Sequence, residues 1–179
     1  MKKFAVIGNP IGHSLSPHLH NYVYNSLGIE ANYEKLKIQI NEIPSIIDDL
    51  RNGVLSGINV TIPHKENIMQ YLDDINPRAK SIGAVNIVMK NGNKLFGNNT
   101  DWFGFFMALQ KNGIDPKKKE VIILGAGGTA KAILFALKQF GVKKITLLNR
   151  TLQKAEELQD EIIFPNSLDY SVQIIKNDS

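Results

Sequence analysis

The sequence contains no cysteine among its 179 residues. This absence excludes disulfides, thiol nucleophiles and thiolate metal sites. Apolar runs near the roughly 18 residues that a membrane-spanning helix needs are also missing, and the four histidines, at positions 13, 18, 20 and 64, match no metal-binding spacing. We therefore expect no metal site, no membrane association, and a soluble cytoplasmic protein without a signal peptide.

Excess charge of one sign is small. The 21 basic and 17 acidic residues leave a net charge of +4. The densest basic run, Lys117-Lys118-Lys119, precedes an expected strand and is typical of a solvated turn. We therefore expect no nucleic-acid partner, and a mild positive field suits an anionic small molecule. A hydrophobic share of 43% is that of an ordinary globular protein.

What the sequence does contain is an alternation of short β-like runs with helical patterns, typical of an α/β fold with a mainly parallel sheet. We expect strands at 4–7, 33–38, 57–62, 84–89 and 94–96, the last two as a hairpin, and helices at 16–27, 43–50 and 64–72. A helix opening at 100–101 carries aromatic residues spaced to cover one packed face: Trp102, Phe103, Phe106 and Leu109.

The most linker-like stretch is 112–120, which is rich in Gly, Pro, Asp and Lys. A domain boundary therefore belongs near the aromatic helix. The sequence predicts an open, mainly parallel α/β domain over 1–100 and a second domain over 101–179.

A glycine-rich turn follows an apolar strand expected over 121–124. Between that strand and a helix expected over 129–140 stands the run Gly125-Ala126-Gly127-Gly128-Thr129-Ala130. Gly125 allows a tight turn, Gly127 lets a pyrophosphate approach the backbone, and Ala130 is small enough for the helix to pack on the strand. N–H groups at the helix N-terminus would bind the phosphates. With a further strand at 144–148, the pattern predicts half of a Rossmann-type dinucleotide-binding domain; a plain turn is the alternative.

The end of the strand at 144–148 bears on the cofactor. A fold that prefers NAD places Asp or Glu there to bind the ribose 2′-hydroxyl, whereas this sequence has Asn149-Arg150-Thr151 and, one turn later, Lys154. Arg150 and Lys154 attract a 2′-phosphate, and the two neutral residues can donate hydrogen bonds. The sequence therefore favours NADP. In the alternative interpretation Thr151 only caps the next helix and Arg150 is a surface charge.

Several polar residues follow the expected strands of the first domain, where open α/β sheets bind ligands. Ser14 and Ser16 precede a helix start and can bind a carboxylate; for Ser16 a simple N-cap is the alternative. Asn59 and Thr61 share one side of a strand, and Asn86 lies within another. These residues describe a pocket for a polyol-like substrate.

Lys65 is expected on the first turn of a helix, where the helix dipole disfavours a cation. Hydride addition to a ketone leaves an alkoxide, so a proton donor is needed beside that oxygen. Lys65 could supply the proton and Asp101 would orient it. A solvated surface lysine and a first-turn carboxylate are the alternatives.

Six ordered blocks between residue 1 and about residue 160 resemble the shikimate dehydrogenase family. The blocks are Gly8-Asn9-Pro10-Ile11-x-His13-Ser14-x-Ser16-Pro17-x-x-His20-Asn21, Asn59-Val60-Thr61-x-Pro63-x-Lys65, Gly83-Ala84-x-Asn86, Asn99-Thr100-Asp101-x-x-Gly104, Gly125-Ala126-Gly127-Gly128 and Asn149-Arg150-Thr151. The resemblance implies NADP-linked interconversion of 3-dehydroshikimate and shikimate in aromatic amino-acid and chorismate biosynthesis, by a monomer or homodimer.

The resemblance also implies roles for individual residues. Lys65 and Asp101 would form the catalytic pair, and Ser14 and Ser16 would hold the substrate carboxylate. The remaining substrate-binding residues, with Asp101 shared between the two sets, would be Asn59, Thr61, Asn86 and Thr100. The cofactor would contact Gly125, Ala126, Gly127, Gly128, Thr129, Asn149, Arg150, Thr151 and Lys154.

Two features depart from the family pattern. Lys154 stands where the family often has Arg, which keeps the charge but loses the planar fork. Family members are roughly half as long again, so the resemblance implies a chain truncated at its C-terminus, with turnover strongly impaired because the nicotinamide would not be fixed against Lys65. A dual quinate/shikimate dehydrogenase and an inactive ligand-binding fragment are the alternatives.

Overall fold

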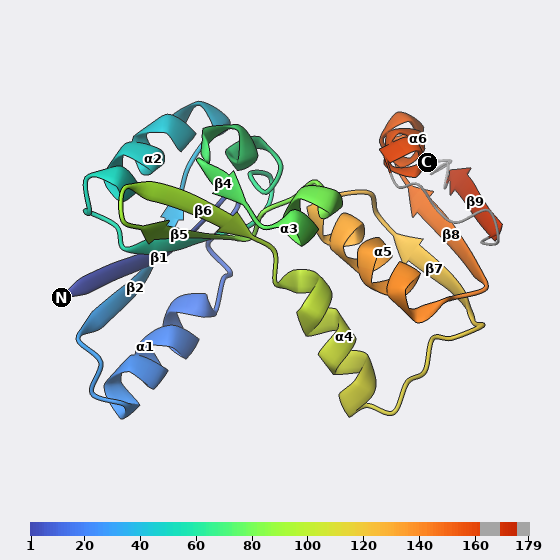
Figure 1. The fold of residues 1–179 in the computed structure, drawn as a ribbon, viewed down its shortest axis with the longest axis horizontal. Helices are drawn as coiled ribbons and strands as arrows, with labels where there is room; N and C mark the ends of the chain where they lie inside the picture. Colours follow the sequence, from blue (N-terminus) through green and yellow to red (C-terminus); the bar gives the residue numbers. More distant parts are fainter. Residues whose placement is uncertain (162–168, 175–179) are drawn as a thin grey trace. The chain divides into compact units, whose positions relative to one another are not determined.

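The structure is a computed structural model that describes residues 1–161 and 169–174. The chain divides into two compact units, Met1–Asn99 and Thr100–Ser179. Figure 1 shows that each unit is built on a sheet of its own. In the described part of the chain, no helix combines the length and the apolar character needed to cross a membrane.

The first unit is built on a six-stranded mixed sheet with the strand order β2-β1-β3-β5-β6-β4. The pairs β1–β2, β1–β3 and β4–β6 are parallel, and the pairs β3–β5 and β5–β6 are antiparallel. The predicted hairpin is therefore confirmed. The strands are β1 (Lys2–Gly8), β2 (Ala31–Lys37), β3 (Gly57–Val60), β4 (Asp74–Ile75), β5 (Ile87–Asn91) and β6 (Lys94–Asn98).

Helices cover both faces of this sheet, with α1 on one side and α2 on the other (Figure 1). Alternation along β1 divides its apolar residues between two cores. Ala5 and Ile7 pack with the α2 side chains, whereas Phe4 and Val6 belong to a smaller cluster on the α1 face. The helices are α1 (Ser16–Ser26), α2 (Ile43–Arg51), α3 (Pro77–Ile82) and two 3₁₀ helices, Ile40–Glu42 and Asn67–Tyr71.

The second unit contains a parallel three-stranded sheet in the order β7-β8-β9. Leu134 and Leu137 of α5 pack against Ile145 and Leu147 of β8. The predicted strand-turn-helix-strand arrangement is confirmed. The elements are α4 (Asp101–Lys111), β7 (Glu120–Leu124), α5 (Gly128–Phe140), β8 (Lys144–Asn149), α6 (Leu152–Glu161) and β9 (Asp169–Ile174).

The segment around Lys65 differs from the sequence expectation. No α-helix begins at His64: residues 62–66 form turns, and a 3₁₀ helix begins at Asn67. The argument from an unfavourable helix dipole at Lys65 was therefore wrong. The backbone of this segment forms a tertiary hydrogen bond instead of a helical one: the Lys65 carbonyl accepts from Val85 N at 2.8 Å.

Two strand predictions had wrong ends: the strand expected at 57–62 was too long, and the strand expected at 84–89 was placed too early. Strand β3 ends at Val60, so Thr61 lies just beyond it, although Thr61 N still donates to Ile7 O at 3.0 Å. Asn86 lies one residue before β5 rather than within it. Its main chain bonds to Val60 N and Asn98 O, so Asn86 bridges two strands at the point where the regular ladder stops.

One helix expectation also fails, and another holds only in part. Ser16 is the first residue of α1 rather than its N-cap, which is Leu15. Ser14 Oγ accepts from Ser16 N at 3.4 Å, so the neighbouring serine supplies the acceptor that this N–H needs.

Helix α4 has no buried residue, and Phe103 is 49% exposed. Instead of covering one closed face, α4 packs on α5: Trp102 meets Phe135 edge-on and Phe106 stacks on Phe140. One neighbouring helix covers only part of an aromatic surface of this size, which explains the exposure.

Candidate functional site

The loops that follow β1 and β3 leave the same end of the sheet and touch each other. Asn9 N donates to Ile62 O at 2.9 Å. A Cβ built on Gly8 would lie 2.5 Å from Thr61 Cγ2 and 3.1 Å from the Ile62 carbonyl oxygen. Only glycine permits this approach, which brings Thr61 against the loop that continues to Ser14.

Lys65 lies in a turn that is held on two sides. Its side chain is largely buried, with 8% of the residue exposed. The carbonyl of Lys65 accepts from Val85 N, and the neighbouring His64, fully buried, donates from Nε2 to Ile38 O at 3.0 Å. Among the described residues, His64 Nδ1 has no hydrogen-bond partner. The turn therefore fixes an amine in a sheltered position at the end of β3.

Asn59 and Asn86 meet at the same sheet end. Asn59 Nδ2 donates to the Asn86 carbonyl oxygen at 3.4 Å, and Val60 N donates to the same oxygen at 2.8 Å. Asn86 is buried, with 9% of its surface exposed. Asn59, Thr61 and Asn86 therefore lie on adjoining strand ends, and the turn of Lys65 is hydrogen-bonded to Val85, next to Asn86.

Ser14 and Ser16 lie together at the N-terminus of α1. Ser14 Oγ is 3.3 Å from Ser16 Oγ, and both residues are half-buried. Lys35 donates from Nζ to Gly12 O at 2.6 Å, which brings a cation to this loop. Two hydroxyls, a helix N-terminus and a nearby ammonium group suit an anion such as a carboxylate. The Lys35 contact was missed from the sequence, where this residue is one of several charges along a strand.

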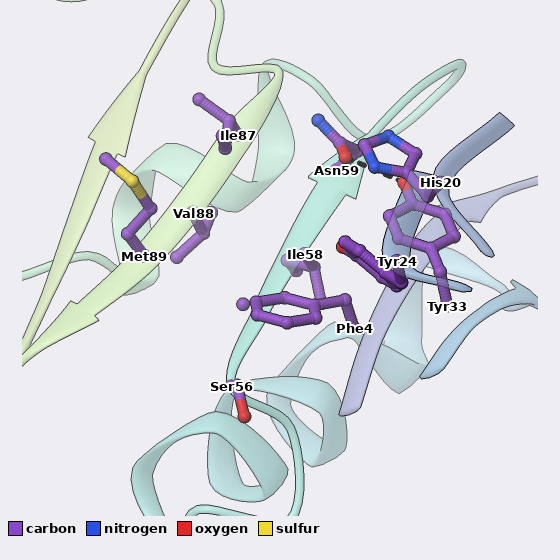
Figure 2. A pocket seen from close by; sticks show the side chains of 11 residues that line it. Phe4, His20, Tyr24, Tyr33, Ser56, Ile58, Asn59, Ile87, Val88 and Met89 are labelled. Atoms are coloured by element: carbon purple, nitrogen blue, oxygen red, sulfur yellow. Dashed lines mark hydrogen bonds between the residues drawn. The ribbon is translucent and has the colours of Figure 1, made fainter. Parts of the chain in front are cut away.

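A pocket of about 200 Å³ opens on the α1 face of the sheet (Figure 2). Asn59 and His20 lie at one end of it, and Phe4, Tyr24 and Met89 form apolar walls. Sequence reasoning did not identify this pocket, because its walls come from five separate elements, β1, α1, β2, β3 and β5.

His20 and Tyr33 stack beside Asn59. Their ring centroids are 4.1 Å apart and their planes differ by 3°. The Tyr33 hydroxyl donates to Asn59 Oδ1 at 2.7 Å. Burial raises the pKa of the Tyr33 phenol and lowers the pKa of the His20 ring, so both groups are biased towards their neutral forms. The available sequence signal was a tyrosine in an expected strand, which by itself indicates packing.

Thr100 and Asp101 open α4, in the second unit. Thr100 is the N-cap and exposed, and Asp101 is in the first turn and half-buried. A carboxylate in the first turn interacts favourably with the helix dipole. A helix-stabilising role of the Asp101 carboxylate is therefore compatible with its predicted role of orienting Lys65.

The glycine-rich turn has the geometry that a phosphate site needs. Gly125 has φ +105°, a left-handed conformation that glycine adopts readily, and its N–H donates to Leu148 O at 2.8 Å. Gly127 is the N-cap of α5, and a Cβ built on it would meet no atom within 4 Å. Open space therefore lies beside Gly127 at the N-terminus of α5. Gly128 and Ala130, in the first turn of α5, are buried. The open backbone at Gly127 and the helix N-terminus fit a pyrophosphate.

The end of β8 presents cations without a carboxylate. Arg150, Thr151 and Lys154 are exposed, and Asn149 Nδ2 donates to Thr151 O at 2.7 Å. Thr129 is exposed on the first turn of α5, after half-buried Ala126 in the turn. The donor set at 149–154 fits the 2′-phosphate of NADP better than a free ribose hydroxyl pair. Within the described ranges no group of three or more His, Asp or Glu side chains could hold a metal ion.

The two units therefore describe an α/β protein with polar strand ends in one sheet and a dinucleotide-type turn in the other. A family model described as shikimate dehydrogenase substrate binding domain matches residues 6–88, and one described as shikimate / quinate 5-dehydrogenase matches residues 107–176. Since the two models together span most of the sequence, the chain belongs to the shikimate dehydrogenase family.

Relatives agree with this assignment. The chain is 47% identical over 156 residues to a shikimate dehydrogenase (NADP(+)) of Bacillus cereus strain AH187, covering 87% of this chain and 56% of that protein. It thus spans about half the length of the curated relatives it matches.

Solved structures of the family are also similar. Shikimate dehydrogenase from Aquifex aeolicus superposes with a TM-score of 0.86 at 38% identity, covering 97% of this chain and 62% of that one. The Thermus thermophilus enzyme in complex with NADP(H) and shikimate gives a TM-score of 0.82 at 39% identity, covering 95% and 62%. The predicted fold class is confirmed.

Proposed function

We propose that this chain carries the substrate and cofactor sites of an NADP-dependent shikimate dehydrogenase, which reduces 3-dehydroshikimate to shikimate in aromatic amino-acid biosynthesis. One observation carries the proposal: the same chain contains both a substrate-type and a cofactor-type site. The first has the buried Lys65 near polar strand ends, and the second has a glycine-rich turn followed by a strand that ends without a carboxylate. The names of the relatives and the ligands of the Thermus thermophilus structure support it.

The proposed substrate contacts follow the chemistry of each group. Ser14 and Ser16 bind the carboxylate through hydroxyls at the α1 N-terminus. The ring hydroxyls exchange hydrogen bonds with polar side chains from two places in the chain. In this proposal they contact Asn59, Thr61 and Asn86 at the strand ends, and the Thr100 hydroxyl and Asp101 carboxylate at the start of α4.

Lys65 is the proposed general acid. NADPH, when bound, supplies the hydride. Lys65 Nζ then donates a proton to the substrate oxygen, which would otherwise become an alkoxide. In the oxidation of shikimate the same amine accepts the hydroxyl proton. Asp101 is proposed to orient the ammonium group.

The second unit is proposed to hold the adenosine end of the cofactor. The backbone of Gly125–Gly128, with Thr129 at the start of α5, receives the pyrophosphate. Arg150 and Lys154 receive the 2′-phosphate, with Asn149 and Thr151 as further donors.

Binding to the purified 179-residue chain tests the two sites separately. We expect calorimetric titration to show shikimate binding that Ser16→Ala weakens, and NADP⁺ binding that exceeds NAD⁺ binding. The matched control is Ser26→Ala, which removes an exposed hydroxyl at the other end of α1 that donates to Tyr22 O within the same helix.

Specific outcomes would contradict the proposal. Equal affinity for NADP⁺ and NAD⁺ would remove the assigned role of Arg150 and Lys154. Shikimate binding that is equally affected by Ser16→Ala and Ser26→Ala would remove the assigned carboxylate site. Tight binding of quinate, with shikimate weaker, would replace the proposed substrate.

A further inference from the structure

Tyr33 reaches across the first sheet to Asn59. In the register, Tyr33 pairs with Phe4, Phe4 pairs with Gly57, and Asn59 lies two residues further along β3. Parallel partners share a face, so Tyr33 and Asn59 both lie on the α1 face. Figure 2 shows the tyrosine ring crossing towards the asparagine amide, which its hydroxyl meets at 2.7 Å.

The hydrogen bonds settle the direction of the Asn59 amide. Its Nδ2 faces the carbonyl oxygen of Asn86 at 3.4 Å, and that oxygen can only accept. Reversing the amide would place Oδ1 against the Asn86 oxygen, which pairs two acceptors. Asn59 Oδ1 therefore faces Tyr33, and the phenol must be the donor. Since 3.4 Å is long for a hydrogen bond, the Tyr33 contact is the stronger restraint on this amide.

The amide so held has its nitrogen fixed away from Tyr33. One lone pair of its oxygen accepts from the Tyr33 hydroxyl, and among the described residues Nδ2 donates only to Asn86 O. An amide nitrogen carries two hydrogens. The second hydrogen leaves Asn59 as a donor, suited to the lone pair of a hydroxyl oxygen.

Tyr33 is itself held by α1. The side-chain amide of Asn21 bonds to both Tyr33 N and Tyr33 O, each at 2.8 Å. The ring of His20 stacks on the phenol ring. Helix α1 begins at Ser16, so one helix carries a proposed carboxylate contact and also fixes the tyrosine that orients a proposed hydroxyl contact.

We propose that Tyr33 is a positioning residue for the substrate: it donates a hydrogen bond to Asn59 Oδ1, so that Asn59 presents an N–H group to a ring hydroxyl oxygen. This inference rests on the proposed function of the site. It adds to that function a residue that touches no substrate and acts through Asn59.

The variant Tyr33→Phe tests the inference because it removes only the hydroxyl and keeps a ring for His20. We expect shikimate affinity to fall about tenfold, the effect of one lost hydrogen bond in a preorganised site. Tyr22→Phe is the matched control, since Tyr22 also lies on α1 but is 75% exposed and does not line the pocket, and the variant loses the same atom; we expect less than about a twofold change.

A double-mutant cycle separates positioning from a general structural effect. In the Asn59→Ala background, Tyr33→Phe should have no further effect on shikimate affinity. A tenfold loss that persists without the Asn59 amide would overturn the inference, because Tyr33 would then act on the site by another route. An unchanged affinity in the single variant would overturn it as well.

The side-chain amide signals of Asn59 in ¹⁵N-resolved NMR give a readout that needs no substrate. Tyr33→Phe should shift these signals and speed their hydrogen exchange, and Tyr22→Phe should not. Unchanged signals in Tyr33→Phe overturn the inference whether or not shikimate binds. If shikimate fails to bind the wild-type chain, the proposed function is wrong. The NMR signals of Asn59 then show by themselves whether the hydrogen bond from Tyr33 holds this amide.

Discussion

The two units build their candidate sites from different parts of the chain. In the first unit the site consists of side chains at strand ends and in the loops beyond them; some are half-buried, whereas Lys65 and Asn86 are each less than a tenth exposed. The cofactor site of the second unit consists of backbone around Gly125 and Gly127, with exposed cations beside it. Replacing a side chain should therefore remove chemistry in the site of the first unit, whereas in the cofactor site it should change affinity or selectivity.

The largest expected effect concerns Lys65. Lys65→Ala should lower kcat by about 10² to 10⁴ relative to the unsubstituted protein, the usual contribution of a general acid, because no other proton donor is assigned beside the substrate oxygen. NADPH oxidation with 3-dehydroshikimate measures kcat, and a separate titration should show unchanged NADPH affinity.

Lys80→Ala is the matched control for this prediction, since Lys80 is an exposed lysine of the same unit, on α3. It should leave kcat unchanged. A loss below about threefold in Lys65→Ala would contradict the assignment of Lys65 as general acid.

The second prediction separates two glycines of one turn. Gly127→Ala should fold normally, since a Cβ there meets no atom within 4 Å and its φ of −95° suits any residue. It should nevertheless weaken NADP⁺ binding about tenfold or more, because the methyl group occupies the space proposed for the pyrophosphate. Calorimetric titration and urea unfolding measure the two effects.

Gly125→Ala should behave differently. Its φ of +105° strains any L-residue, at a cost of about 1 to 3 kcal/mol in the free energy of unfolding. If Gly127→Ala destabilises the fold as much as Gly125→Ala does, the open space at Gly127 is not the cause of its effect on binding.

Sequence reasoning reached the second site more fully than the first. The turn at Gly125, helix α5 and Gly141 at its end depend on local preferences: a left-handed turn residue, an apolar helical period and a C-cap glycine at φ +66°. Local preferences can be recognised in a sequence. The positions proposed to bind the cofactor were therefore placed on the correct elements, although their roles stay predictions.

The first site depends on which strands are neighbours, and local patterns do not contain that information. Alternation assigns Tyr33 to a face, but its contact with Asn59 requires the order β2-β1-β3. The turn at Lys65 was mistaken for a helix because Ile68 and Leu72 have helical spacing. Tertiary bonds from His64 to Ile38 and from Val85 to Lys65 outweighed that local preference.

The third prediction concerns cofactor selectivity. Arg150→Ala should weaken NADPH binding about tenfold and leave NADH binding nearly unchanged, because only NADPH carries the 2′-phosphate that the guanidinium would bind. Titrating both cofactors measures the difference. Losses of equal size for NADPH and NADH would mean that Arg150 supports the structure at the end of β8 rather than selecting the cofactor.

The smallest expected effects concern one ion pair in each unit. Arg51 and Asp73 form a two-pronged contact, with nitrogen–oxygen distances of 3.0 and 3.1 Å, and Asp73 also accepts from Leu95 N at 2.7 Å. Lys143 and Glu120 share a single contact of 2.9 Å, and both side chains are more than half exposed. Preorganised geometry and a backbone donor favour the first pair, so Asp73→Asn should lower the melting temperature more than Glu120→Gln.

The pH dependence has a definite sign. The hydrogen bond from Arg51 holds the pKa of Asp73 below its ordinary value, and the hydrogen bond from Lys143 does the same for Glu120. A carboxyl whose pKa is lower in the folded state stabilises the fold above its unfolded pKa, and this contribution is lost as pH falls through the folded value. The melting-temperature gap between wild type and Asp73→Asn should therefore be full at about pH 7 and shrink below about pH 4. A melting-temperature gap that stays constant from about pH 7 to about pH 3 would mean that Asp73 acts through packing.

A larger melting-temperature gap for Glu120→Gln than for Asp73→Asn would reverse the predicted order of the two ion pairs.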